Sequence, residues 1–411
     1  MTAPFAPLSS SEIYQGCRTP SMRSVFSVSS SEATLTPSAS AREVYEGLST
    51  PGWWDLSMRS THTGDLEDGH YSSAAEQWGI PVGALTAGVA SPKPVKRRGK
   101  LEVSEYGSET FKFDELAAAT KYFRFDCLIG EGGYGRVYRG ILRSNNQVVA
   151  IKQYNYGTGS ERELLVEVRM QRLIRHQNIV NFVGYYTEGN QMFVVHEYMS
   201  LGSLQDHLHD LSSNKKHLDW NTRMKIAAGV AKGLEFLHDE AIFPVIFGGL
   251  KASNILLEKG YIPKLSDLGL AILAPVGDES PMRTTVIATD GYSAPEYAMS
   301  RRLNLKSDIY SFGVVLLEII TGRKAVRNSK DTEEPSLVEW ARPLLKDDRN
   351  FLQMVDPMLG GQYPIEGLCE ALDLASKCVQ EQPDVRPLIR NIARTLTDLA
   401  SHISDATTTF S

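Results

Sequence analysis

A glycine-rich stretch is the first place in this chain where residue types and spacing point to chemistry. Three glycines follow the spacing G-x-G-x-x-G and are flanked by branched apolar residues: Ile129, Gly130, Gly132, Gly135 and Val137. A backbone without Cβ atoms can close over phosphate groups, so this spacing predicts a phosphate-binding turn. On its own the signal is weak, because glycine-rich turns are common.

A lysine and an acidic helix supply the charges that such a turn needs. The sequence V-A-I-K, ending at Lys152, comes after it at strand-to-strand distance, so its ammonium group is expected to pair with the α- and β-phosphates. Three carboxylates downstream could hold this lysine: Glu161, Glu163 and Glu167. We expect Glu167 to do so, because the apolar residues next to it mark the inward face of a helix.

Two oxygen-bearing side chains further along predict a divalent metal ion. They are Asn254 and Asp267, the latter within the sequence K-L-S-D-L-G. An amide oxygen, a carboxylate and phosphate oxygens together suit Mg²⁺, with Mn²⁺ as the alternative. The residues that this turn and its charges offer to a nucleotide are Ile129, Gly130, Gly132, Gly135, Val137, Lys152 and Glu167.

These side chains need a sheet to carry the glycines and a helical body to carry the metal ligands. Strand-like runs fill residues 123–199, and helical periods of apolar residues dominate 200–400. Asp219 precedes an amphipathic helix as its cap, and Gly322 closes a helix that is apolar on most faces. The sequence therefore predicts an α+β fold with a β-rich N-lobe and a helical C-lobe.

Taken in order, the motifs resemble those of protein kinases across about residues 111–400. Val245–Asn254 is similar to the catalytic-loop pattern H-R-D-L-x-x-x-N, Lys264–Gly269 to D-F-G with Leu for Phe, and Ser293–Glu296 to A-P-E. The resemblance implies the bilobal protein-kinase fold and the use of ATP with Mg²⁺. It also implies that Ala150, Glu197, Met199 and Leu256 bind the nucleotide.

Two further stretches, Phe111–Phe123 and Leu201–Leu211, look like segments of plant receptor-like cytoplasmic kinases of the immune-signalling subfamily seven. This resemblance implies a Ser/Thr-type kinase acting in the cytoplasm beneath cell-surface receptors. It also implies structural roles for three residues. Arg386 pairs with Glu296, and Asp308 accepts hydrogen bonds from the catalytic-loop backbone.

The catalytic-loop segment departs from the kinase pattern at its two central positions. Gly248 stands where the pattern has Arg and Gly249 where it has the catalytic Asp, whereas Lys251 is retained. Glycine can neither orient a substrate hydroxyl nor accept its proton, and losing a positioned base costs about 10²–10⁴ in rate, or roughly 3–5 kcal/mol of barrier. Without the Arg, a phosphate on the activation segment has no guanidinium group at this position to bind it.

Other positions depart from the family as well. Gln171 is polar where kinases place an apolar spine residue, and His196 takes the gatekeeper position. Ala288 and Asp290 replace the Gly and the usual Tyr of the peptide-docking stretch, which weakens the case for peptide docking.

The motifs and their departures support three hypotheses. The first is a pseudokinase that binds ATP and acts as a scaffold, decoy or allosteric partner of active receptor-like kinases or other signalling proteins. The second is a working Ser/Thr kinase with an atypical loop, because positioning and electrostatics supply most phosphoryl-transfer catalysis. The third is an adaptor that acts through the N-terminal segment.

That segment, residues 1–100, is rich in Ser, Thr and Pro and lacks a sustained apolar period, so disorder is expected. It carries a short motif twice, in Glu12–Ser24 and Glu43–Ser60, and two linked copies would suit bivalent docking. Chance similarity in a biased sequence is the alternative. The predicted order is a disordered segment (1–100), an N-terminal extension (101–122), the N-lobe (123–199), the C-lobe (200–400) and a tail (401–411).

Composition limits partners and location. The chain has 411 residues and a net charge of −6, which gives no general attraction to nucleic acid. No apolar run approaches the roughly 18 residues of a membrane span, so at most peripheral membrane contact is expected. A cytoplasmic location is predicted; the basic cluster Lys93–Lys100 leaves the plasma-membrane periphery and the nucleus open, with a solvated linker as the alternative.

Overall fold

The described part of the chain runs from residue 109 to residue 406, with several gaps. The computed structural model describes residues 109–132, 135–155, 160–210, 216–274, 282–283, 290–326 and 335–406. The N-terminal repeat, the basic cluster and Ala288 lie outside these residues, and so do the predictions made for them.

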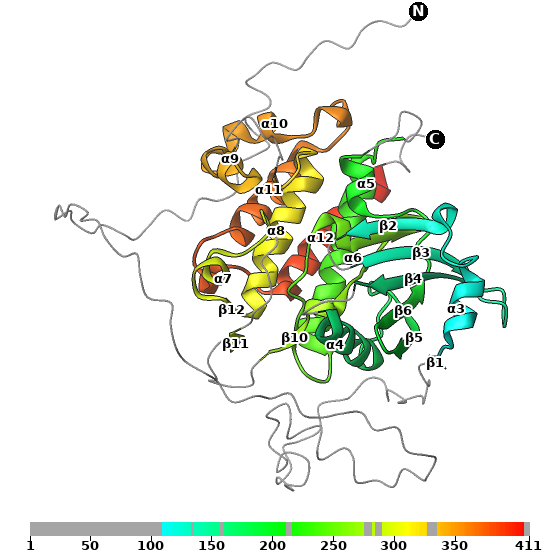
Figure 1. Cartoon of the computed structure of the whole chain (residues 1–411). Helices are drawn as coiled ribbons and strands as arrows, with labels where there is room; N and C mark the ends of the chain where they lie inside the picture. The colour runs from blue at the N-terminus through cyan, green and yellow to red at the C-terminus, as the bar shows by residue number, and fades with distance from the viewer. Residues whose placement is uncertain are drawn as a thin grey trace, which may run out of the picture. The chain divides into compact units, whose positions relative to one another are not determined.

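Within the described residues the sheet has six strands in the order β1-β5-β6-β4-β3-β2 (Figure 1). β1 pairs with β5 in parallel, and the other pairs are antiparallel. The strands are β1 (Glu109–Thr110), β2 (Leu128–Gly132), β3 (Gly135–Ile141), β4 (Val148–Tyr154), β5 (Phe182–Glu188) and β6 (Gln191–Glu197).

The two faces of this sheet bury different residues because side chains alternate along a strand. Val149 and Ile151 of β4 pack beneath α3 (Phe113–Ala119), where Leu116 is fully buried. On the other face, Tyr154 and Val194 belong to a cluster with residues of α4 (Ser160–Leu173). A short helical turn, η2 (Phe125–Cys127), leads from α3 into β2.

Helices make up most of the chain after β6. The elements are α5 (Leu204–Leu208), α6 (Trp220–Glu235), η3 (Phe236–Glu240), β7 (Val245–Ile246), η4 (Ala252–Asn254), β8 (Ile255–Glu258), β9 (Ile262–Leu265), η5 (Leu268–Leu270), β10 (Ile272–Leu273), β11 (Met282–Arg283), α7 (Pro295–Ser300), β12 (Arg302–Leu303), α8 (Leu305–Thr321), α9 (Leu337–Leu344), η6 (Asp348–Asn350), α10 (Phe351–Met354), η7 (Pro357–Leu359), α11 (Ile365–Cys378), η8 (Pro383–Val385) and α12 (Ile389–Ala406).

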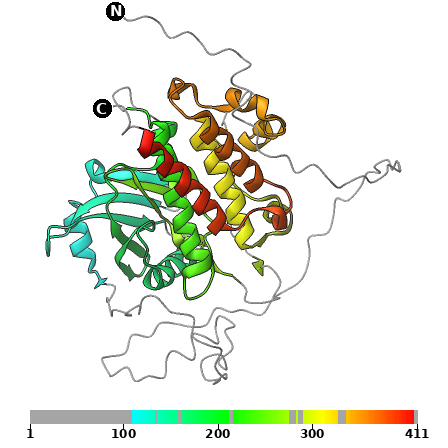
Figure 2. The same cartoon turned by 180° about the vertical axis from the view of Figure 1, so that it is seen from behind.

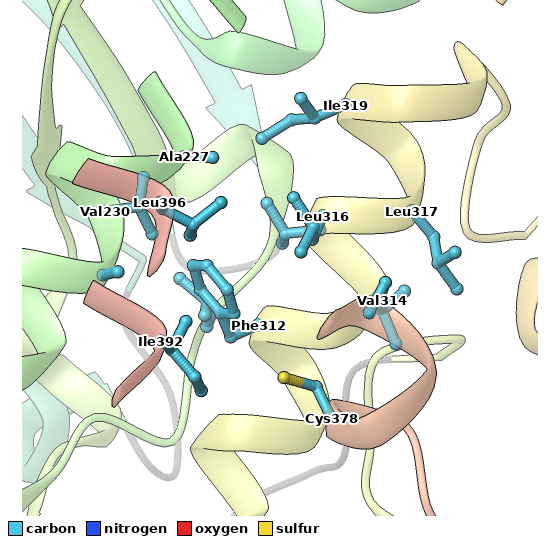
Figure 3. Packing of buried hydrophobic residues seen from close by; sticks show 14 of the residues in the cluster. Ala227, Val230, Phe312, Val314, Leu316, Leu317, Ile319, Cys378, Ile392 and Leu396 are labelled. Atoms are coloured by element: carbon cyan, nitrogen blue, oxygen red, sulfur yellow. The ribbon is translucent and has the colours of Figure 1, made fainter. Parts of the chain in front are cut away.

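The helical core is built around α8, which runs beside α6, α11 and α12 in both views (Figures 1 and 2). Phe312 of α8 is fully buried and points toward Val230 of α6 and Leu396 of α12 (Figure 3). Burying an aromatic side chain of this size contributes about 1.5–3 kcal/mol. This packing fixes α8, which in turn holds the loop between β7 and η4.

Both helices expected from their end signals are present. Asp219 accepts a hydrogen bond from the backbone of Thr222 at the start of α6. α8 ends at Gly322, whose φ of 66° is the left-handed conformation that glycine adopts without a Cβ clash. The predicted α+β bilobal fold is thus confirmed. None of the described helices is long and apolar enough to cross a bilayer.

Candidate nucleotide and metal site

The glycine-rich turn lies between β2 and β3. Gly135 has a φ of +143°, and a Cβ there would stand 1.8 Å from the carbonyl oxygen of Gln153, so only glycine fits. Gly130 packs against Val137, with 3.8 Å from its ideal Cβ to the Cβ of Val137. Val137 is paired with Lys152 in the β3–β4 ladder, which brings the turn next to the lysine.

Lys152 is the centre of a buried charge cluster. Its Nζ lies 3.3 Å from Oε2 of Glu167 and 2.9 Å from Oδ1 of Asp267. The Glu167 side chain is 1% exposed, so an unpaired carboxylate there would be costly. Of the three carboxylates considered for Lys152, Glu167 is thus in contact with it, and the side chains of Glu161 and Glu163 are not described.

The charges in this cluster shift one another's pKa. Burial lowers the pKa of Lys152, but Asp267 and Glu167 outweigh it and hold the pKa well above its usual value. Burial raises the pKa of Asp267, yet Lys152, with a further contribution from Lys251, holds it below its usual value. The lysine is therefore charged and the aspartate ionised near neutral pH, as phosphate and metal binding require.

Other polar side chains also contact the Glu167 carboxylate. Tyr154 donates its hydroxyl to Oε2, and Nε2 of His196 lies 3.3 Å from Oε1. Nε2 of Gln171 is 3.4 Å from the same His196 nitrogen, while Oε1 of Gln171 has no hydrogen-bond partner within the described part of the chain. Burial lowers the pKa of His196.

The remaining predicted nucleotide-binding residues lie on β2, β4, β6, β8 and the connection between the lobes. Ala150 is paired with His196 in the β4–β6 ladder, and Met199 is 6% exposed. Oε1 of Glu197 accepts a 2.8 Å hydrogen bond from the buried Lys264. Leu256 forms an isolated β-bridge with Ser203, so β8 lies under the connection. Ile129, by contrast, is 47% exposed; it lies on β2, which is an edge strand of the sheet.

The two predicted metal ligands both lie next to Gly249. The side-chain oxygen of Asn254 and Oδ2 of Asp267 accept no hydrogen bond from the described residues, whereas Nδ2 of Asn254 and Oδ1 of Asp267 are engaged. Two free hard oxygens fit a cation of the Mg²⁺ type that completes its shell with phosphates and water. The described residues contain no group of three or more His, Cys, Asp or Glu that could hold a metal by itself.

The loop before η4 is held in place by hydrogen bonds between side chains and its backbone groups. Nδ2 of Asn254 donates a 2.8 Å hydrogen bond to the carbonyl oxygen of Gly249. Asp308 of α8 accepts hydrogen bonds from the backbone N–H groups of Phe247, at 2.7 Å, and Gly248, at 2.9 Å. Nε2 of His238 lies 2.9 Å from the same carboxylate. The loop thus keeps its shape with no carboxylate at position 249.

The expected pairing beyond the loop is also present. Arg386 places NH1 and NH2 each 2.8 Å from the Glu296 carboxylate, and its side chain is fully buried. Bidentate Arg–carboxylate pairs are strong because both hydrogen bonds are charge-assisted. This pair ties α7 to the segment that precedes α12.

Sequence reasoning missed Tyr154 and Lys264. Tyr154 is two residues beyond Lys152 on the same strand, and the period of two places both side chains on one face, so strand alternation could have found it. Lys264 gave no such signal, because its contact with Glu197 joins β9 to the lobe connection across 67 residues.

A strand-rich lobe with a glycine turn and a buried Lys–Glu pair, joined to a helical lobe that carries Asn and Asp oxygens, is the architecture of protein kinases. The family model of the protein kinase domain matches residues 123–396. The chain belongs to the protein kinase family.

Plant serine/threonine kinases are similar to most of the chain. The probable serine/threonine-protein kinase PBL7 of Arabidopsis thaliana is 59% identical over 319 residues, which are 75% of this chain and 84% of PBL7. PBS1 of the same species is 54% identical over 304 residues, 74% of this chain and 67% of PBS1. PBL27 is 58% identical over 299 residues, which are 72% of this chain and 58% of PBL27.

The comparisons therefore confirm the resemblance at the level of the protein kinase domain and of PBL- and PBS1-type relatives. Protein kinase domains use ATP and a divalent metal ion. The nucleotide-binding roles of individual residues, and the consequence of Gly249, stay predictions.

Proposed function

We propose that the chain is a nucleotide-binding pseudokinase. The observation that carries the proposal is the position of Gly249 beside Asn254 and Asp267. An ideal Cβ at Gly249 would lie 3.6 Å from Nδ2 of Asn254 and 3.8 Å from the carbonyl oxygen of Asp267. A carboxylate attached there would face the metal ligands, and glycine offers none.

The charged residues around this gap support nucleotide binding. Lys152 would hold the α- and β-phosphates, with Glu167 orienting it. Asn254 and Asp267 would hold Mg²⁺, or Mn²⁺, between the phosphates, where the ion screens their charge. The ion pairs keep Lys152 and Asp267 charged, which phosphate and cation binding would need.

Such a protein signals by the shape that it takes when nucleotide is bound. We propose that it acts as a scaffold, decoy or allosteric partner of active receptor-like kinases. The support is its similarity to plant kinases named PBL7 and PBS1, together with a catalytic loop that lacks the base.

A thermal-shift titration with Mg-ATP tests nucleotide binding. We expect a rise in Tm for the wild type and a much smaller one for Lys152→Ala. A ligand at 100 times its Kd stabilises by about 2.7 kcal/mol, which such an assay resolves. If neither protein shifts, nucleotide binding is refuted.

A slow but genuine Ser/Thr kinase is the second candidate. It is favoured by Lys251, whose charge already acts on Asp267 and which could stabilise the γ-phosphate. Single-turnover assays with labelled ATP separate the two candidates. Transfer that Asp267→Asn abolishes would establish the kinase, whereas transfer that survives this change comes from a contaminant.

A further inference from the structure

Three consecutive residues after α3 have a left-handed backbone. Lys121, Tyr122 and Phe123 have φ values of 52°, 62° and 55°. This conformation is unfavourable for a residue with a Cβ, because the Cβ comes too close to the following carbonyl oxygen. A run of three such residues persists only where the surrounding contacts hold it in place.

The buried hydroxyl of Thr120 holds this turn against α3. Its Oγ1 donates a 2.9 Å hydrogen bond to the carbonyl oxygen of Leu116 and accepts a 3.1 Å hydrogen bond from the backbone N–H of Phe123. The backbone N–H of Tyr122 donates to the carbonyl oxygen of Ala117, at 2.6 Å. The turn is therefore a fixed structure at the end of the helix.

The turn separates its aromatic side chains into a buried one and two exposed ones. The ring of Phe123 stacks on that of Phe193, with 5.2 Å between their centroids. Tyr122 is 79% exposed, and Phe125, at 87%, is the most exposed large apolar side chain in the described part of the chain. We call residues 121–125 the aromatic turn. Two large rings held in water by a rigid turn indicate a contact surface.

Cations flank these rings. Nζ of Lys121 lies 3.6 Å and Nε of Arg124 lies 3.1 Å from the carboxylate of Asp126. Both cationic side chains are 64% exposed. One carboxylate shared by two cations leaves a net positive charge, and α3 separates this charge from Asp114 and Glu115 in its first turn. The aromatic turn therefore suits a negatively charged partner.

The sequence just before the fold carries the same sign of charge. The cluster Lys93–Lys100 contains five basic residues. Stable attachment of a protein to a bilayer surface takes two contributions, such as apolar insertion together with a polybasic segment. α3, which the aromatic turn follows, lies on the side of the strand-rich lobe away from α8 in both views (Figures 1 and 2). The helical lobe thus leaves this side open to a flat surface.

We propose that the aromatic turn binds the surface of an anionic lipid bilayer. Tyr122 and Phe125 insert at the level of the headgroups, where aromatic rings are favoured, and Lys121 and Arg124 contact the anionic lipids. A bilayer is favoured over a protein because a continuous charged surface attracts Lys93–Lys100 as well and needs no matching pocket. The proposal does not depend on nucleotide binding.

Sedimentation of the full-length protein with lipid vesicles tests the proposal. The vesicles consist of phosphatidylcholine alone or with about one-third phosphatidylserine. The test variant combines Tyr122→Asn with Phe125→Ser, because asparagine tolerates a left-handed backbone and keeps the shape of the turn. The matched control combines Ile242→Ser with Met299→Ser, which removes apolar side chains that are 75% and 84% exposed elsewhere on the domain.

We expect the wild type and the control to sediment with the phosphatidylserine vesicles and not with phosphatidylcholine alone. The test variant should bind them at least about tenfold more weakly, since it loses the apolar insertion. Added salt should weaken wild-type binding, because it screens the attraction to the headgroups. The proposal is overturned if the wild type stays in the supernatant, if the test variant binds equally well, or if the control loses as much binding.

A second measurement covers the case in which the test variant does not fold, which its thermal unfolding reveals. Phe125→Trp should show a blue shift of its added tryptophan emission with phosphatidylserine vesicles, as the indole leaves water. An unchanged spectrum contradicts insertion. Sedimentation without vesicles that needs the two aromatic residues would assign the aromatic turn to a second copy of the chain and refute the lipid role.

Discussion

Asn254 closes the catalytic loop by donating its side-chain amide to the carbonyl oxygen of Gly249, at 2.8 Å. The contact uses the backbone of Gly249 and leaves the side-chain oxygen of Asn254 without a partner among the described residues. The arrangement of the two predicted metal ligands therefore does not depend on a side chain at position 249. The proposed loss of the base at position 249 is thus compatible with an intact arrangement of Asn254 and Asp267.

The two loop glycines should respond to substitution in opposite ways. Gly248 has a φ of +69°, and a Cβ there would lie 3.1 Å from the carbonyl oxygen of Leu270, so Gly248→Ala should cost about 1–2 kcal/mol of unfolding free energy. Gly249→Ala meets no atom closer than 3.6 Å and should be neutral or stabilising by about 0.4–1 kcal/mol. Urea unfolding of both variants measures the difference, and an equal loss in both would contradict the assigned loop geometry.

Asp267→Asn should remove the metal dependence of nucleotide binding. The change keeps the shape of the side chain but takes away the charge that a divalent cation needs. Calorimetric titration with ATP should show tighter binding in Mg²⁺ than in EDTA for the wild type, and the same affinity in both for the variant. Asp210→Asn, which changes an exposed carboxylate just beyond α5, is the control and should behave like the wild type. A variant that still responds to Mg²⁺ would place the ion elsewhere.

Gln171→Leu should stabilise the protein. Gln171 is 1% exposed, and its Oε1 has no partner within the described residues, so burying it costs free energy that a leucine of similar size avoids. We expect the unfolding free energy to rise by about 1 kcal/mol. Loss of the amide contact with His196 reduces this gain. Denaturant unfolding checks this, and a loss of stability would mean that the amide oxygen is hydrogen-bonded in solution.

Acid should weaken the contact between α7 and the segment before α12. Burial raises the pKa of Glu296, but hydrogen bonds from Arg386 outweigh it, so the net pKa is below its ordinary 4.5. A carboxyl whose folded pKa is lowered stabilises the fold above its unfolded pKa and loses that contribution as the pH falls through the folded pKa. The unfolding free energy should thus fall below about pH 4.5.

The neutral variant Glu296→Gln isolates this contribution. It should be less stable than the wild type at pH 7, with the difference shrinking as the pH drops below about 4.5. Thermal unfolding across this range provides the measurement. A difference that stays constant with pH would show that the charge of Glu296 is irrelevant to stability.

Much of the fold could be predicted from sequence because its signals are local. The cap at Asp219, the glycine at 322 and the strand-like runs of residues 123–199 each report on residues next to them in the chain. Glu167 could be chosen over its neighbours for the same reason, since helical spacing places it on the inward face.

The contacts that escaped prediction join distant elements. The pairing of His209 with Glu318 spans 109 residues, and that of Lys264 with Glu197 spans 67. Nothing in the sequence around either residue marks its partner, because the contact exists only once α5, α8 and β9 have packed. The loop at Gly248 is similar: the motif located it, but its left-handed backbone came only from the structure.

The central claim is that the site binds a nucleotide and lacks only the carboxylate that would act as the catalytic base. The most direct test is single-turnover phosphoryl transfer from Mg-ATP to a peptide by the wild type and by Gly249→Asp, with Gly249→Asn as the uncharged control. We predict that restoring the aspartate raises the rate by about 10²–10⁴ and that the asparagine does not. A wild type that transfers phosphate as fast as Gly249→Asp would contradict this claim.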